Sequence, residues 1–295
     1  MNIDSSQPFD DVGRDILVVT GGHRVDFDAL FAMMTAICEA EGWRWAHVHQ
    51  PTGQRWLVPE RSRGWDAVLV HDIPGLRLQR GVAPLAEPAP RAVQEALHRL
   101  LGRGQGLVVT HHALAGWPSW EGWADALGGR FHYAPGRLHG REWPSSGTRV
   151  ATYTAQVVAP AHPVCAGLDD FVLTDELYCC PVFEHEVVPL LRTDADMDGR
   201  LFTSTYEHVL FGPDDAPDCS THPPASDLIA WANVAERSPV VYVQPGDSAA
   251  TFRAAPYRHL LTNALRWVAS PAAHEWAAGH PRPLRMDDDG TPDSD

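Results

Sequence analysis

The stretch Ile16-Leu17-Val18-Val19-Thr20, followed by Gly21-Gly22-His23, decides the fold of this chain. A short run of apolar and β-branched residues is typical of a strand that is buried on both faces, as in a parallel sheet. The two glycines end the strand. Apolar side chains then recur at helical spacing over about residues 26–41, and Gly42 stops the predicted helix. This strand, turn and helix predict an α/β protein.

The same alternation continues through the first half of the chain. Apolar runs predict further strands at residues 43–48, 66–72 and 106–110, and amphipathic patterns predict helices at about 91–101 and 119–127. Ser119 is the candidate N-cap of the second of these helices. Because β-α-β connections are right-handed, this order predicts a doubly wound, mainly parallel sheet with helices on both faces.

The second half is more irregular and richer in predicted strands. We expect strands at 149–158 and 186–193, an antiparallel hairpin of 228–234 with 240–243, and a closing helix at 256–269. No linker separates the halves, so one domain over residues 15–280 is favoured. Residues 1–14 are expected to form a flexible N-terminus, and 281–295 a disordered acidic tail.

The charge of the chain excludes one class of partner. The formal net charge is −15, and the five aspartates beyond Arg285 leave about −10 on the body. An acidic body lacks the clustered positive charge that nucleic acid requires. We find no secretion signal and no apolar run of about 20 residues, so a cytoplasmic protein without a membrane partner is expected. The five cysteines show no CxxC spacing and indicate neither a disulfide framework nor a thiolate zinc site.

Histidines gather where three predicted strands end. The strand at 16–20 is followed by Gly22 and His23. The strand at 66–72 ends in His71-Asp72, and the strand at 106–110 is followed by His111-His112. Ligands of open parallel sheets bind at the carboxyl ends of the strands, and imidazole suits proton transfer or metal binding. Each histidine alone is better explained by a hydrogen bond to a loop carbonyl; the cluster predicts a functional pocket. Only one of the adjacent pair His111-His112 easily faces it.

Several short segments together resemble the ThuA-like (trehalose-utilisation) family. These are Gly21-Gly22-His23 before a helix, Gly128-Gly129-Arg130-Phe131, and His162-Pro163 followed by Asp175-Glu176-Leu177-Tyr178. The resemblance covers roughly residues 15–269. It implies a flavodoxin-like fold similar to class I glutamine amidotransferases, and a role in the metabolism of sugars or 3-keto sugars.

Two features depart from the related patterns. The family usually has a Gly-His pair after its last core strand, where this chain has Gly246-Asp247. A glutaminase needs a cysteine on the turn after a strand, whereas the matching turn here is His111-His112. Glutamine hydrolysis is therefore not expected, and Asp247 is a candidate substrate-binding residue in place of the missing histidine.

The acidic pair Asp175-Glu176 supplies the candidate carboxylates of the predicted site. Consecutive residues of an extended segment face opposite ways, so one carboxylate can enter the pocket while the other caps a turn. The alternative is an ordinary helix N-terminus, where acidic residues are common. Tyr178 lies beside them as a candidate substrate-binding residue. Trp117 and Trp120 offer indole faces on which a sugar ring could stack, or they simply pack a helix on the sheet.

Two functions remain open from the sequence. The first is an enzyme acting on a sugar or keto-sugar, with His111, His112, Asp175 and Glu176 as catalytic acid–base groups. No cofactor is certain; His23, His112 and Glu176 form a candidate set for a divalent metal, zinc or manganese. The second is a non-catalytic sugar-binding or regulatory module. The expected partner is a small sugar, and the oligomeric state is open between monomer and homodimer. No GxGxxG follows the first strand, which argues against a dinucleotide-dependent oxidoreductase.

Overall fold

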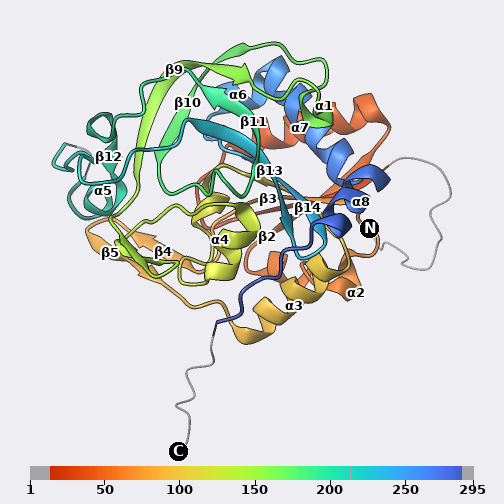
Figure 1. Cartoon of the computed structure of the whole chain (residues 1–295), viewed down its shortest axis with the longest axis horizontal. Helices are drawn as coiled ribbons and strands as arrows, with labels where there is room; N and C mark the ends of the chain where they lie inside the picture. Colours follow the sequence, from red (N-terminus) through yellow and green to blue (C-terminus); the bar gives the residue numbers. More distant parts are fainter. Residues whose placement is uncertain (1–13, 213, 288–295) are drawn as a thin grey trace, which may run out of the picture.

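The first predicted strand, Asp15–Gly21 (β1), lies inside the parallel half of a ten-stranded sheet (Figure 1). The computed structural model describes residues 14–212 and 214–287. The parallel half has the spatial order β2-β1-β3-β6-β14. Its further strands are Arg44–His49 (β2), Ala67–Asp72 (β3), Gly106–Thr110 (β6) and Ser238–Val243 (β14). When only these five parallel strands are numbered along the chain, their spatial order is 2-1-3-4-5. This is the flavodoxin-like arrangement, and it confirms the predicted fold class.

Alternation along β1 explains why helices cover both faces of this sheet. Ile16 and Val18 belong to one apolar core, and Leu17 and Val19 belong to a second core on the opposite face. All four side chains are fully buried. A strand buried on both faces must be apolar throughout, which is the pattern that the sequence shows.

The helices divide between the two cores (Figure 1). The first core receives Phe27–Glu41 (α1), Ala249–Arg253 (α6), Ala255–Val268 (α7) and Pro271–Gly279 (α8). On the other face lie Pro59–Ser62 (α2), Arg91–Gly102 (α3) and Glu121–Leu127 (α4). The Asp26 side chain caps α1 by accepting from the Ala29 N–H at 2.9 Å, and Gly42 ends it in a left-handed conformation, as the sequence predicts.

The start of α4 differs from the prediction. Ser119 is not the N-cap; Trp120 takes that place without a side-chain hydrogen bond, and the helix begins at Glu121. The reason is a separate turn just before the helix, in which the Trp120 N–H donates to the Trp117 carbonyl at 2.9 Å. Residues 117–120 therefore form their own turn, and the helix starts only after it.

The remaining strands are antiparallel and extend the sheet beyond β14 in the order β13-β11-β9-β10. They are Gly147–Val157 (β9), Phe171–Cys179 (β10), Val188–Thr193 (β11) and Leu228–Ala235 (β13), with Thr203–Ser204 (β12) paired to β9. The hairpin β13-β14 is confirmed. β10 was not predicted, and it shows that the helix N-terminus considered for Asp175-Glu176 is wrong.

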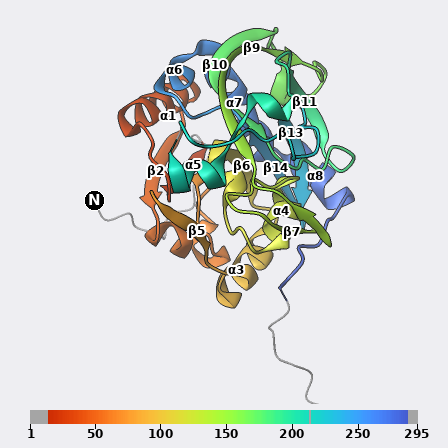
Figure 2. The ribbon, with the colours of Figure 1, turned by 90° about the vertical axis from the view of Figure 1, so that its left-hand side faces the viewer.

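Two small hairpins lie outside the predicted strands, the first of them in a segment expected to be a loop. They are Leu76–Gln79 (β4) with Val82–Ala86 (β5), and Gly136–Leu138 (β7) with Arg141–Trp143 (β8). The helix Thr205–Phe211 (α5) lies beside the first hairpin, where the Gly81 N–H donates to the Val209 carbonyl at 2.8 Å. Figure 2 shows α5 above β5 on the side of the molecule that faces the viewer.

The last described residues, 281–287, pack against the body, although the sequence assigns them to the acidic tail. Arg282 forms a β-bridge with Glu236, and the Trp120 indole N–H donates to the Arg285 carbonyl at 2.6 Å. Leu284 is buried. Residues 1–13 and 288–295, which hold most of the expected flexible ends, lie outside the described residues. No helix among the described residues is long and apolar enough to cross a membrane.

Candidate functional site

His111 stands at the sharp turn directly after β6. Its φ is +53°, in the left-handed region that non-glycine residues rarely adopt, and its side chain is almost fully buried. The Tyr242 hydroxyl holds this turn by donating to the His111 carbonyl at 2.7 Å. Strained backbone that is held by its surroundings is frequent at functional sites. The turn therefore presents an imidazole at the carboxyl edge of the sheet, at the position where a glutaminase would need its thiol.

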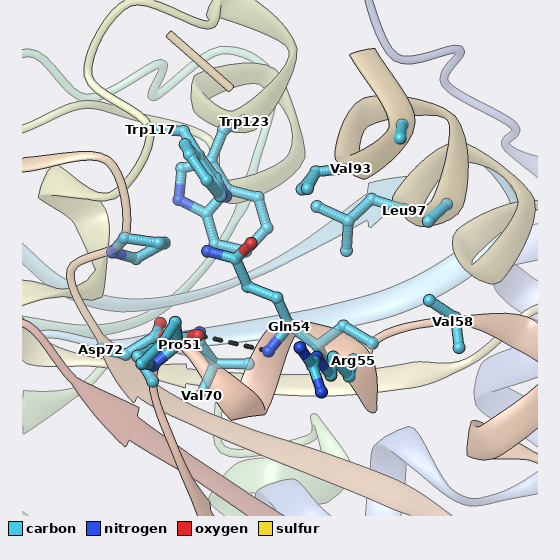
Figure 3. A pocket seen from close by; sticks show the side chains of 15 residues that line it. Pro51, Gln54, Arg55, Val58, Val70, Asp72, Val93, Leu97, Trp117 and Trp123 are labelled. Carbon is cyan, nitrogen blue, oxygen red and sulfur yellow. Dashed lines mark hydrogen bonds between the residues drawn. The ribbon is translucent and has the colours of Figure 1, made fainter. Parts of the chain in front are cut away.

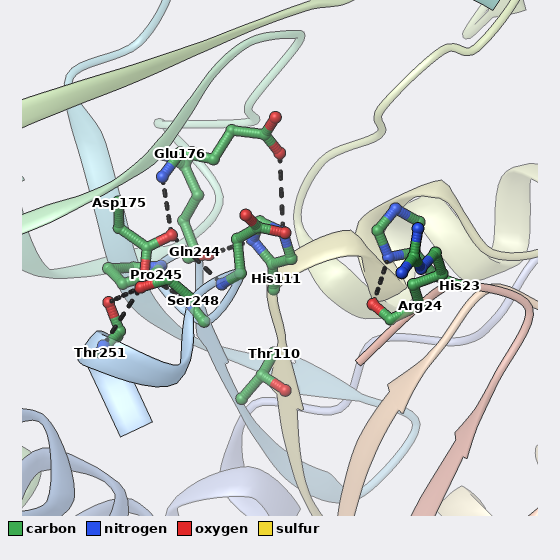
Figure 4. A network of polar contacts seen from close by, with 12 residues as sticks. His23, Arg24, Thr110, His111, Asp175, Glu176, Gln244, Pro245, Ser248 and Thr251 are labelled. Carbon is green, nitrogen blue, oxygen red and sulfur yellow. Dashed lines mark hydrogen bonds and ion pairs between the residues drawn. The ribbon is translucent and has the colours of Figure 1, made fainter. Parts of the chain in front are cut away.

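The hydrogen bonds of His111 fix the roles of its two ring nitrogens. Nδ1 lies 2.9 Å from the Gln244 carbonyl oxygen, which can only accept, so Nδ1 carries the hydrogen. Nε2 is then the basic nitrogen. It faces Glu176 Oε2 at 3.6 Å (Figure 4) and Asp247 Oδ1 at 3.5 Å. The Tyr178 hydroxyl contacts both ring nitrogens, at 2.9 Å from Nδ1 and 3.0 Å from Nε2. One imidazole thus meets two carboxylates and a phenol.

Asp175 does not face His111; its carboxylate holds the backbone of the residues around the site. Its buried carboxylate accepts from the backbone N–H of Gly246 and of Asp247, both at 3.1 Å, and from that of Glu176 at 2.7 Å. It therefore ties the middle of β10 to the turn after β14. Glu176, one residue along the strand, points instead toward His111 (Figure 4). The acidic pair is divided between the pocket and a turn, as the sequence suggested.

Gly246 permits this turn to approach His111. Its φ is +145°, and a Cβ there would meet the Tyr257 hydroxyl at 2.9 Å and the His111 Cβ at 3.4 Å. The Tyr257 hydroxyl itself donates to the Pro245 carbonyl at 2.9 Å. A side chain at position 246 would force the turn away and carry Asp247 with it.

The charges of the site perturb one another. Burial lowers the pKa of His111, but the hydrogen bond to Asp247 and the charges of Glu176 and Asp175 outweigh it, so the net pKa is raised. Burial raises the pKa of Glu176 despite the nearby imidazole. The hydrogen bond to His111 lowers the pKa of Asp247 against the effect of burial. Perturbed titratable groups in contact are a mark of functional sites.

Three more histidines form a row that continues from His111. The His112 ring lies 5.1 Å from that of His111, 4.3 Å from that of His71 and 4.4 Å from that of His23. His71 Nδ1 is paired with the Thr110 hydroxyl at 2.8 Å, and His23 Nδ1 with the Arg24 carbonyl at 2.9 Å. His112 Nδ1 is buried without a partner among the described residues.

Burial keeps this row of imidazoles uncharged. It lowers the pKa of His71 to about 3, with help from the neighbouring His111 and His23. It also lowers the pKa of His23, and it lowers that of His112 well below the usual value. At neutral pH these three imidazoles are thus uncharged; His71 and His112 are buried, and His23 is the partly exposed one.

The other predicted site residues have different surroundings. Gly22 approaches the loop after β3 so closely that a Cβ would lie 2.4 Å from the Ile73 carbonyl oxygen, which gives it a backbone role. Trp120 is completely buried and has no exposed face for a sugar. Asp72 and Trp117 line a separate cavity on the other face of the sheet (Figure 3).

The sequence missed three residues that complete the site: Gln244, Thr110 and Thr148. Gln244 orients His111, Thr110 orients His71, and the Thr148 side chain is hydrogen-bonded to Glu176. Gln244 acts through its backbone carbonyl, so its side chain gives no signal for this role in the sequence. Nothing in the local pattern of β9 marks Thr148.

A metal ion fits the geometry around His111. Among the described residues, His111, Glu176 and Asp247 form a group whose ligand atoms all lie within 4.8 Å of one another. Ligands at the usual zinc distances of about 2.0–2.2 Å lie roughly 3.4 Å apart in a tetrahedral site. The two separations from His111 Nε2, 3.6 Å to Glu176 and 3.5 Å to Asp247, are close to this value. This group shares Glu176 with the set proposed from the sequence, but it has His111 and Asp247 in place of His112 and His23.

Comparison with known proteins identifies the class of this α/β protein. The family model described as trehalose utilisation (ThuA) matches residues 77–268. Because that match spans well over half of the sequence, the chain belongs to the ThuA family. No curated protein matches the chain.

Two solved structures show the same fold. A ThuA-like protein of Bacteroides uniformis is 17% identical, with a TM-score of 0.59 over 90% of this chain and 95% of that one. A ThuA-like protein of Parabacteroides merdae is 14% identical, with a TM-score of 0.62 over 88% and 90%. At such identities the likeness concerns the fold alone.

Proposed function

We propose that this ThuA-family protein is an enzyme that acts on a sugar or keto-sugar by acid–base chemistry centred on His111. The observation that carries the proposal is the contact of one oriented imidazole nitrogen with two carboxylates, at 3.6 Å from Glu176 and 3.5 Å from Asp247. Membership of the trehalose-utilisation family supports a sugar as the substrate class. The absence of a thiol at the turn after β6 argues against a glutaminase.

The residues divide into three roles. His111 Nε2 exchanges a proton with a sugar hydroxyl or carbonyl, while the Gln244 carbonyl keeps the ring in the required tautomer. Glu176 is the second acid–base group, and Asp247 orients the imidazole or a sugar hydroxyl. Asp175 acts through both carboxylates as a positioning residue.

A divalent cation is compatible with this centre. His111, Glu176 and Asp247 would hold it with one nitrogen and two oxygen ligands, a set that zinc and manganese accept. Because Nδ1 carries the hydrogen, Nε2 would be the nitrogen ligand and would no longer exchange a proton, so the ion is an alternative to the base role of His111. A bound ion would polarise a carbonyl oxygen of the substrate. His23, the partly exposed member of the row, would then remain available for a hydrogen bond to the sugar.

One pair of variants tests the proposal. Disaccharides and their 3-keto derivatives are first screened with the wild type, and product is detected by mass spectrometry. His111→Ala should fold and should no longer turn over the compound that this screen identifies as the substrate. His132→Ala is the matched control, because His132 is also buried, while its charged neighbours are Arg130 and His222 rather than the residues assigned roles above. Folding of both is checked by circular dichroism. Turnover that survives in His111→Ala would show that the centre is wrongly placed.

Two further measurements separate the alternatives. Elemental analysis of the purified protein, repeated on Glu176→Gln, reports a resident metal independently of activity. Calorimetry with the same sugars reports binding. A sugar that binds tightly in the wild type and is recovered unchanged would refute catalysis and favour a binding module.

A further inference from the structure

A second cavity lies on the opposite face of the sheet from the row of histidines. Successive residues of a strand point to opposite faces, so His71 faces the row while Asp72, the last residue of β3, faces this cavity. The cavity has a volume of about 310 Å³. Figure 3 shows Asp72 and Pro51 on one side of it and helix α3 with Val93 and Leu97 across from them.

The walls of this cavity are apolar. Trp117 and Trp123 form one wall, and Val93 and Leu97 of α3 form another (Figure 3). Trp117 is placed by an unusual backbone conformation, with φ at +45°. Its N–H donates to the Pro74 carbonyl at 2.7 Å. Aromatic and aliphatic walls with few polar groups are typical of small-molecule pockets.

Asp72 is the acidic group in the lining of the cavity, and it lacks one hydrogen bond. The residue is 1% exposed. Its Oδ2 accepts from the Gln50 side-chain amide, whereas Oδ1 is buried without a partner among the described residues. A buried acceptor without a donor costs about 1–3 kcal/mol, and more when it is charged. Such groups are rare and call for a donor that completes them.

No cation of the described chain supplies that donor. The lining contains one, Arg55, and it is exposed to solvent. Burial raises the pKa of Asp72 to about 7, against the effect of Gln50. Above that pH the cavity therefore contains a buried negative charge that only a neutral amide contacts. A cationic donor entering from solvent would regain both the hydrogen bond and the charge interaction.

We propose that this cavity is a second binding site, separate from His111, for a small molecule that has an apolar ring and a primary ammonium or amidinium group. The ring lies between the Trp117–Trp123 wall and α3, and the cationic group donates to Asp72 Oδ1. The site does not depend on the sugar chemistry proposed above, because it lies on the other face of the sheet.

The test uses benzylamine and its neutral analogue benzyl alcohol as probes. Calorimetry at pH 8.5, with the full chain, should show that benzylamine binds the wild type more tightly than benzyl alcohol does. Asp72→Asn keeps the shape of the side chain and removes its charge. It should weaken benzylamine binding by about tenfold or more, the usual effect of losing a charge-assisted hydrogen bond, and should change benzyl alcohol binding less than about threefold.

Two further variants locate the binding. Val93→Trp, at a half-buried position of the lining, fills the cavity and should abolish binding of both probes while circular dichroism and Tm report an intact fold. His111→Ala should leave benzylamine binding unchanged, which keeps this test independent of the proposed enzyme. Equal affinity of the two probes for the wild type, or benzylamine binding unaffected by Asp72→Asn, would overturn the assignment.

Discussion

Replacing Asp72 by asparagine should change how the stability of this protein depends on pH. Burial raises the pKa of Asp72 from 3.8 to about 7, although the hydrogen bond from Gln50 opposes the shift. The folded state therefore retains a proton that the unfolded chain has already lost between about pH 4 and pH 7. Because the unfolded state then binds fewer protons, the free energy of unfolding falls as pH rises through this window.

The size of the effect follows from the shift. A shift of about three pKa units, at 1.36 kcal/mol each, lowers the free energy of unfolding by about 4 kcal/mol in total. The whole of this loss is present once the pH is above the pKa of Asp72 in the folded state. Nearly half of that window lies between pH 5.5 and 7, so about 2 kcal/mol is lost over this part. Asparagine cannot ionise and removes this contribution. The stability of Asp72→Asn relative to the wild type should thus increase by about 2 kcal/mol from pH 5.5 to pH 8.

Urea unfolding of both proteins at several pH values measures this difference directly. Asp169→Asn is the control, because Asp169 is exposed and the substitution makes the same change in formal charge. Its stability relative to the wild type should stay nearly constant over the same range. A constant difference for Asp72→Asn as well would mean that Asp72 is ionised at pH 5.5, and would refute the argument from its buried, unpartnered oxygen.

Three other substitutions probe the loops around His111. Asp175→Ala leaves three backbone N–H groups without their acceptor and should lower the free energy of unfolding by about 3 kcal/mol or more in urea titrations; a loss below about 1 kcal/mol would contradict the positioning role. Gly246→Ala brings a Cβ to 2.9 Å from the Tyr257 hydroxyl and should lower Tm by several degrees, whereas Gly64→Ala, with open space around it, should not; equal Tm values would refute the close approach. Tyr178→Phe should leave Tm nearly unchanged and reduce turnover of the screened sugar about tenfold or more, because it removes the hydroxyl that contacts both ring nitrogens of His111. Unchanged turnover would exclude that contact from the chemistry.

The parallel half of the fold could be predicted because its strands are buried on both faces. Such strands are continuous apolar runs, and the structure places β1, β3 and β6 within a residue or so of the predicted ranges. β10 was not predicted, because Thr174, Asp175 and Glu176 interrupt its apolar residues and acidic pairs also occur at helix starts. Its extended form depends on pairing with β9, a contact between distant segments that no local pattern encodes.

The candidate site was predictable in outline and not in detail. Histidines at strand ends and the divided acidic pair came together around His111, because the carboxyl ends of parallel strands share one edge. The sequence also assigned His71 and Asp72 to a single pocket. Their positions on β3 place them on opposite faces, and the alternation that separated Asp175 from Glu176 would have separated them too. The tautomer of His111 depends on Gln244, whose position only the folded chain reveals.

The three hydrogen bonds to Asp175 have a consequence for selectivity. One carboxylate holds the backbone N–H groups of both Glu176 on β10 and Asp247 on the neighbouring turn, so the distance between the points where their side chains begin has little freedom to change. Whatever occupies the gap between these side chains must match a preset width. Among divalent ions the larger calcium, with its bond lengths of 2.3–2.6 Å and its six to eight ligands, should then be rejected on size and ligand number rather than on charge.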